Sequence, residues 1–174
     1  MEEKKVMTHV QKGLLVSLIL IIVDLVGYFT KLAEQSWYSW ASNCVLFIAV
    51  IWGCIHYANQ MNNQVTFGNV FGYGFKLSIV VALIMIIYVL LVMTVVFPDR
   101  KERALEIARE RMEERGNLSD AQIEQGIEFT KKFFFPFVIA AILFGTIIFG
   151  TIASLLGAAI AKKKPVNPLD QMTV

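Results

Sequence analysis

Four uninterrupted apolar stretches constrain the fold of this 174-residue chain more than any other feature. A helix needs about 20 predominantly apolar residues to cross a hydrocarbon core of about 30 Å. The predicted spans are residues 13–31, 37–58, 77–97 and 133–161. The sequence therefore predicts an all-α integral membrane protein with four transmembrane helices, in which residues 1–174 form a single membrane domain.

The composition agrees with a membrane location. Hydrophobic residues make up 56% of the chain and charged residues only 17%, whereas soluble domains put roughly a quarter of their residues into charge. Nearly all of the charge lies in the two ends and in one central block. These figures argue against disorder, a nucleic-acid-binding surface, a disulfide framework and a large soluble enzyme core.

The basic residues near the ends of the chain predict its topology. Lys4, Lys5 and Lys12 precede the first span, which is too long for a cleaved signal peptide and is interpreted as a retained anchor; a cleaved signal is the alternative. Three further lysines, 162–164, follow the fourth span. Four spans put both termini on one side, and these lysines favour the cytoplasm, although the central block carries eight basic residues against the six at the two ends.

The central block, residues 98–132, is predicted to form a helical hairpin outside the bilayer. Pro98 suits a helix start after the third span. The first arm, about residues 99–115, mixes glutamate and arginine with a narrow apolar stripe, and Gly116 supplies a left-handed stop.

The second arm of the hairpin has a clear predicted start. Ser119 and Gln122 have the spacing of a capping box. Helical periodicity then continues into the fourth span, with a bend expected near Pro136. The hairpin is either a solvated connection or a docking surface, because it is far longer than two adjacent spans require.

Asp24 is an acidic residue near the middle of the first span. A charged side chain there costs at least about 2.5 kcal/mol on insertion scales. One interpretation is a proton or cation site involving Asp24 and Asn43. The alternatives are a neutral carboxyl hydrogen-bonded within the bundle, to Ser17, Tyr28, Asn43 or a backbone carbonyl, and a hydrogen bond between subunits.

Two groups of small residues are candidate contact sites. Small residues recur every four positions in the fourth span, at Thr146, Gly150, Ser154 and Ala158. Such a face lets helices approach closely, either within the bundle or with another chain. The second group, Gly68, Gly72 and Gly74 with Lys76, is predicted to form the interfacial start of the third span. A lipid-headgroup site at this segment is the alternative.

Catalytic and metal-binding motifs are missing from the sequence. Cys44, Cys54, His9 and His56 are the only cysteines and histidines, and they lack the spacing of a metal site. No nucleophile elbow or phosphate-binding loop is present, because the glycine-rich segment lies between two spans rather than after a soluble strand. We therefore expect no enzymatic activity, no cofactor and no metal.

Three stretches together resemble a known family: residues 67–75, residues 118–124 leading through 131–136, and residues 150–164. The chain resembles the domain-of-unknown-function 4199 family, small four-span inner-membrane proteins of Bacteroidota-type bacteria. The resemblance implies a bacterial inner-membrane location and supplies no catalytic residues. Members are often encoded near polyprenol-phosphate glycosyltransferases, which implies an accessory role in envelope glycan assembly.

The sequence thus favours a non-enzymatic scaffold or accessory subunit that contacts membrane lipid and binds another membrane protein or a second copy of itself. The alternative is a small carrier or proton-coupled transport component that uses Asp24.

Overall fold

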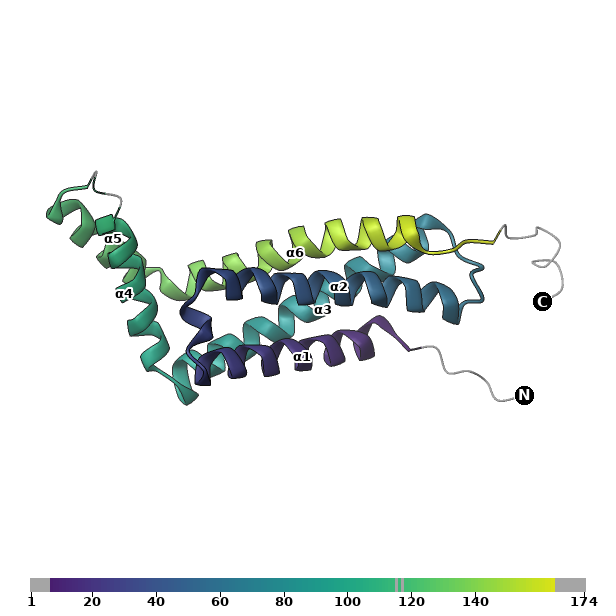
Figure 1. The fold of residues 1–174 in the computed structure, drawn as a ribbon, viewed down its shortest axis with the longest axis horizontal. Coiled ribbons are helices and arrows are strands. Elements are labelled where there is room, and N and C mark those ends of the chain that lie inside the picture. Colours follow the sequence, from purple (N-terminus) through teal and green to yellow (C-terminus); the bar gives the residue numbers. More distant parts are fainter. Residues whose placement is uncertain (1–6, 115, 117, 165–174) are drawn as a thin grey trace. The chain divides into compact units, whose positions relative to one another are not determined.

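The computed structural model describes residues 7–114, 116 and 118–164, and the regular elements in that part of the chain are helices. Among them are four long apolar helices: α1 (His9–Phe29), α2 (Ser36–Gln60), α3 (Phe67–Leu91) and α6 (Phe134–Ile160) (Figure 1). Two shorter helices, α4 (Asp99–Glu114) and α5 (Asp120–Lys132), connect α3 to α6. The predicted all-α architecture, with four candidate spans and a helical hairpin between the third and the fourth, is confirmed.

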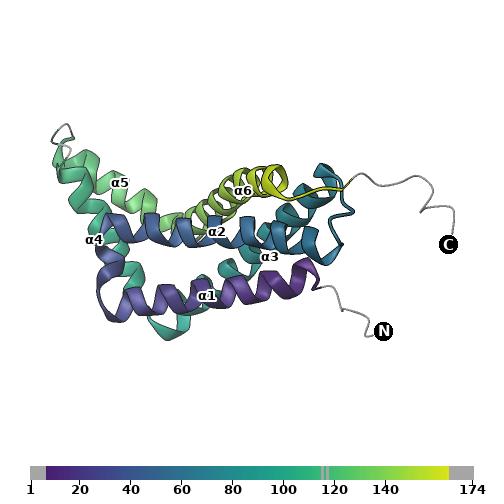
Figure 2. The same ribbon diagram turned by 45° about the vertical axis from the view of Figure 1, so that its right-hand side comes forward.

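The chain divides into two compact units, which are described separately. The four-helix unit comprises residues 1–84 and 145–174, and so contains α1, α2, the first part of α3 and the last part of α6. The hairpin unit comprises Met85–Phe144, with the end of α3, α4, α5 and the start of α6. In the four-helix unit, α1 and α2 lie side by side in both views (Figure 1 and Figure 2) and are joined by a short 3-10 turn, Leu32–Glu34.

A capping box starts α1, and a contact with α2 lies near its other end. The helix begins at a capping box, in which the Gln11 amide N–H donates to the Thr8 hydroxyl at 3.2 Å and the Thr8 N–H donates to the Gln11 side chain at 3.1 Å. Near its other end, the hydroxyl of Tyr38 on α2 donates to the carbonyl of Val23 at 2.5 Å. The Tyr38 ring occupies the place where a Cβ on Gly27 would be, so the glycine allows the two helices to approach closely.

Three helices of the four-helix unit carry a glycine followed four residues later by a serine. The pairs are Gly13 and Ser17, Gly74 and Ser78, and Gly150 and Ser154. Each serine is at most 1% exposed and donates to the carbonyl of its own glycine, at 2.8, 3.0 and 2.6 Å respectively. The glycine admits a neighbouring helix, and the hydrogen bond satisfies a hydroxyl that would otherwise be costly to bury.

These small residues bring α6 against α3 and α2. A Cβ on Gly150 would overlap the Ser78 side chain, and a Cβ on Gly74 would lie 2.6 Å from the Ser154 hydroxyl and 2.5 Å from the Cys54 sulfur. A Cβ on Gly157 would lie 2.7 Å from the Cβ of Cys54. Close approach of this kind is how helices gain packing contacts where lipid offers no hydrophobic drive for association.

The first and last described residues of the chain lie at the same end of the four-helix unit. The Tyr73 hydroxyl, near the start of α3, donates to the Met7 carbonyl at 3.0 Å. The Lys164 N–H, just after α6, donates at 2.8 Å to the carbonyl of Asn63, which lies between α2 and α3. Lys12 lies at the same end, whereas Lys4 and Lys5 lie outside the described residues.

Within the hairpin unit, α3 ends at Leu91. A π-helix, Val92–Val96, follows α3 directly, and its Phe97 N–H donates to the Val92 carbonyl at 2.7 Å. Gly116, between α4 and α5, has the predicted left-handed backbone with φ of 64°. The Ser119 and Gln122 capping box is also confirmed, with the Ser119 N–H donating to the Gln122 side chain at 2.9 Å.

An ion pair and a side-chain contact lie between α4 and α5. Arg109 and Glu124 form an exposed ion pair with an N–O distance of 2.6 Å. The Met112 sulfur lies 3.3 Å from the position of a Cβ on Gly126. Ile123 is only 6% exposed and is the buried residue of α5.

Two helix boundaries differ from the predicted ones. The helix of the third candidate span begins at Phe67, ten residues before the predicted span, so the glycine-rich segment is helical and forms the first part of α3. The second arm of the hairpin does not run on into the fourth span, because α5 ends at Lys132 and α6 begins at Phe134. The bend expected near Pro136 is present as a helix break at Phe133, because Pro136 has no N–H to donate to the Lys132 carbonyl and therefore suits only the first turn of the next helix.

Candidate functional site

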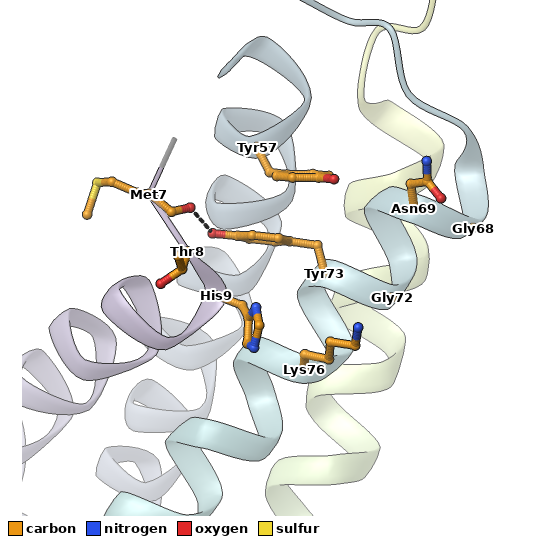
Figure 3. Close-up of a pocket in the computed structure, with 9 residues that line it drawn as sticks. All are labelled: Met7, Thr8, His9, Tyr57, Gly68, Asn69, Gly72, Tyr73 and Lys76. Carbon is orange, nitrogen blue, oxygen red and sulfur yellow. Dashed lines mark hydrogen bonds between the residues drawn. The ribbon is translucent and has the colours of Figure 1, made fainter. Parts of the chain in front are cut away.

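A cavity of about 500 Å³ opens at the end of the four-helix unit where α1 and α3 begin and α2 ends (Figure 3). Met7, Thr8 and His9 line it from the start of α1, and Tyr57 from the last turn of α2. The residues from α3 are Gly68, Asn69, Gly72, Tyr73 and Lys76. Three helix ends that are far apart in the sequence therefore form one site.

Two tyrosines form the aromatic wall of the cavity. The rings of Tyr57 and Tyr73 are stacked, with centroids 4.2 Å apart and an interplanar angle of 10°. Figure 3 shows the Tyr73 hydroxyl directed at the Met7 carbonyl, where it donates its hydrogen bond, and the His9 ring below Tyr73. The His9 and Tyr73 rings meet edge to face with centroids 6.2 Å apart. The hydrogen bond and the ring contacts fix this wall.

Two glycines of α3, Gly68 and Gly72, keep the other side of the cavity open. A Cβ on Gly72 would meet nothing within 4 Å, and a Cβ on Gly68 would meet only the Thr66 hydroxyl at 4.0 Å. Neither glycine is required for helix packing, although glycine is less favourable than alanine by about 1 kcal/mol in a helix. Gly74 differs, because it is packed against Cys54 and Ser154 and does not line the cavity.

A buried lysine lies behind the tyrosine wall. Lys12 on α1 is 1% exposed, and its side-chain nitrogen donates to the carbonyl of Gly53 at 3.3 Å. The same nitrogen lies 4.9 Å from the centre of the Tyr73 ring and 5.9 Å from that of Trp52. Carbonyl oxygen and ring faces both carry negative partial charge, so the pocket around Lys12 suits a basic group.

The lining of the cavity is mainly apolar and carries several basic and polar groups. Lys76 is an exposed lysine whose amine lies beside the cavity in Figure 3, together with the Asn69 amide and the His9 ring. None of the nine lining residues is acidic. Lys163 lies at the same end, 5.4 Å from the centre of the Phe67 ring, and does not line the cavity. The arrangement can bind an anion that offers oxygen acceptors.

The other predicted site residues lie elsewhere. Asp24 and Asn43 are half-buried on α1 and α2, and neither lines this cavity. Gly150, Ser154 and Ala158 are buried inside the four-helix unit, and Thr146 is half-buried. Among the residues that the structure describes, no group of three histidines, cysteines or acids could hold a metal ion.

Sequence reasoning identified only part of the cavity. It singled out Gly68, Gly72 and Lys76, and the structure places all three on its lining. It missed Thr8, His9 and Tyr57, because nothing in a sequence pairs the start of one span with the end of the next. The Thr8 and Gln11 capping box was a readable signal that the first helix begins before residue 13.

Comparison with known proteins gives a family and no activity. A family model described as "Protein of unknown function (DUF4199)" matches residues 11–163. No curated protein and no solved structure matches the chain.

Proposed function

The chain belongs to the DUF4199 family of proteins of unknown function, and we propose that this multi-pass membrane protein is a non-enzymatic scaffold or accessory subunit that binds another membrane protein. The observation that carries the proposal is an apolar groove on α4. The groove has a volume of about 260 Å³ and is lined by Ala104, Ile107, Ala108, Arg111 and Met112. It lies on a helix that is otherwise dominated by charged side chains.

The groove has the features of a helix-docking site. Ala104 and Ala108 are one turn apart, so a partner helix can approach the α4 backbone closely. Ile107 and Met112 add apolar contact, and Arg111 places a basic group at the groove. The occupant that fits is an amphipathic helix of a partner membrane protein with an acidic side chain opposite Arg111.

The contacts between α4 and α5 support the use of the hairpin as a binding surface. The Arg109 and Glu124 ion pair and the Met112 and Gly126 contact lie between the two helices and show that they are paired. A paired hairpin loses less conformational entropy on binding than a flexible connection of the same length.

A matched pair of substitutions tests the proposal. Ala108→Glu places a carboxylate in the groove, whereas Ala121→Glu makes the same change at an exposed position of α5. Tagged full-length proteins are purified from the membranes of the native host in a mild detergent, and copurifying proteins are identified by mass spectrometry. We expect a specific partner with wild type and with Ala121→Glu, and its loss with Ala108→Glu.

Two results would overturn the docking role. The first is that no protein copurifies reproducibly with wild type. The second is that the partner remains bound when Ala108 is replaced by Glu. Thermal unfolding in the same detergent checks that both variants fold.

We also propose that the protein lies in the bacterial inner membrane with both termini in the cytoplasm. The position of Lys12 and Lys164 at one end of the four-helix unit supports this orientation, because basic residues are retained on the cytoplasmic side. This orientation is tested with two variants, Ser119→Cys and Thr173→Cys, each labelled with a membrane-impermeant maleimide on intact cells. We expect labelling at 119 alone, above a wild-type background that carries Cys44 and Cys54.

A further inference from the structure

We propose that the cavity at the end of the four-helix unit binds the phosphate group of an anionic membrane phospholipid. The proposal uses no residue of the hairpin unit, so it stands or fails independently of the docking role. It rests on the position of the cavity, the donors on its lining and the two glycines that keep it open.

The position of the cavity matches that of lipid headgroups. His9 begins the first candidate span, Gln60 ends the second and Phe67 begins the third. The cavity is lined from the same three helix ends. A site at the ends of spans lies where the polar groups of the bilayer lie, so a phosphate can enter it while the acyl chains stay in the membrane.

The lining supplies donors and no competing acid. Lys76 offers an ammonium group, Asn69 an amide and His9 an imidazole. The hydroxyl of Tyr73 is already engaged with Met7, so it serves to fix the wall. Hydrogen bonds from charged donors to phosphate are about twice as strong as neutral ones, which makes Lys76 the main anchor.

The two glycines of the lining leave room for a bound group. Gly72 contacts no other part of the described chain where its Cβ would lie, and Gly68 has one contact at the limit of van der Waals distance. Other glycines of the unit, such as Gly74 and Gly150, are needed because a neighbouring helix occupies the Cβ position. At Gly68 and Gly72 the absent side chains leave room for a bound group instead.

Native mass spectrometry of the full chain measures the binding. The purified protein is offered equal amounts of phosphatidylglycerol and phosphatidylcholine in a mild detergent, and the retained lipid is identified. We expect one phosphatidylglycerol to be retained in preference to phosphatidylcholine. Equal retention of the two lipids would overturn the proposal, because the basic lining should select a net negative headgroup.

Two pairs of variants locate the site. Lys76→Gln should weaken phosphatidylglycerol binding about tenfold, the size of one hydrogen bond to a charged group. Lys163→Gln removes the same charge outside the cavity and should leave binding unchanged. Gly72→Leu should abolish binding by filling the cavity, and Gly145→Leu is its control, because a Cβ on Gly145 also meets nothing within 4 Å.

Each variant can contradict the proposal. If Lys76→Gln and Lys163→Gln weaken phosphatidylglycerol binding equally, the lipid is attracted by the overall positive charge at this end of the unit and not by the cavity. Unchanged binding by Gly72→Leu would place the lipid elsewhere. A separate arm offers inorganic phosphate in excess; if it binds alone and displaces the lipid fully, the site takes free phosphate and the lipid assignment is wrong.

Discussion

The side-chain nitrogen of Lys12 donates to the backbone carbonyl of Gly53 across 3.3 Å, from a position that is 1% exposed. The aliphatic part of the side chain fills space between α1 and α2, while the nitrogen meets groups of negative partial charge. Shape and charge at this position can therefore be tested separately.

Lys12→Met nearly conserves the volume of the side chain, is one heavy atom shorter and removes the charge. We expect its stability to lie within about 1.5 kcal/mol of wild type, because the volume is conserved. Lys12→Glu puts a carboxylate against the Gly53 carbonyl and should cost at least about 3 kcal/mol. Thermal unfolding in detergent measures both, and equal losses for Met and Glu would show that the basic group itself is essential.

Gly72 and Gly74 should respond in opposite directions to the same substitution. Gly72→Ala should leave stability unchanged or raise it by up to about 1 kcal/mol, since its Cβ meets nothing within 4 Å. Gly74→Ala should lower it by about 1 to 3 kcal/mol, because its Cβ would lie 2.5 Å from the Cys54 sulfur. Chemical unfolding followed by circular dichroism compares them; a stable Gly74→Ala protein would contradict the close packing of α3.

The contact between Gly150 and Ser78 should appear as a coupling in a double-mutant cycle. Gly150→Ala alone should destabilise the protein, because the added methyl overlaps the Ser78 side chain. Ser78→Gly removes that obstacle, so the double variant should lose at least about 0.5 kcal/mol less than the sum of the single losses. Strictly additive losses would show that the two positions are not in contact.

Ile123, rather than the neighbouring ion pair, should hold the hairpin unit together. Ile123 is 6% exposed, and Ile123→Ala should cost about 2 kcal/mol or more. Glu124→Ala breaks an ion pair whose side chains are 43% and 61% exposed, and should cost less than about 1 kcal/mol. Hydrogen exchange of the α4 and α5 amides reports both, and a greater loss of protection in Glu124→Ala would reverse this order.

Asp24→Asn separates the accessory role from the carrier alternative. Asparagine keeps the shape of the side chain and its capacity to accept a hydrogen bond, so we expect normal protein levels and normal partner binding. The measurement is growth of the host carrying the variant as its only copy. A growth defect equal to that of a full deletion, at unchanged protein level and partner binding, would favour proton-coupled transport.

The sequence was most informative where a structural feature depends on neighbouring residues. Span number follows from long apolar runs, and the turn from α4 to α5 follows from Gly116 and the Ser119 capping box, so these predictions are confirmed. The helix α3 begins ten residues before the apolar run that predicts the third span, because the glycine-rich segment in front of that run is also helical. Cys54 and Ser154 pack where a Cβ on Gly74 would lie, so this helical position requires a glycine, and no local pattern reveals that contact.

The candidate site was harder to predict for the same physical reason. Lys76 and the cavity glycines lie within one segment and could be singled out together. Lys12 reads as a flanking charge in front of a span, yet it is buried against Gly53 through a contact 41 residues away in the chain. The environment of a lysine on an apolar helix depends on the neighbouring helices that pack against it. The burial of Lys12 could therefore be recognised only from the three-dimensional structure.

Because of the π-helix Val92–Val96, the two ends of the third span should differ in how well they tolerate the loss of a residue. A π-turn holds one residue more than an α-turn, so one residue can be lost there and the segment can still close a hydrogen-bonded turn. A deletion between Gly74 and Ser78 would instead rotate the preceding residues by about 100° relative to those that follow, and separate the small residues from α6. Single-residue deletions that arise in evolution should therefore survive at the Val92–Val96 end of this helix and be eliminated at the other.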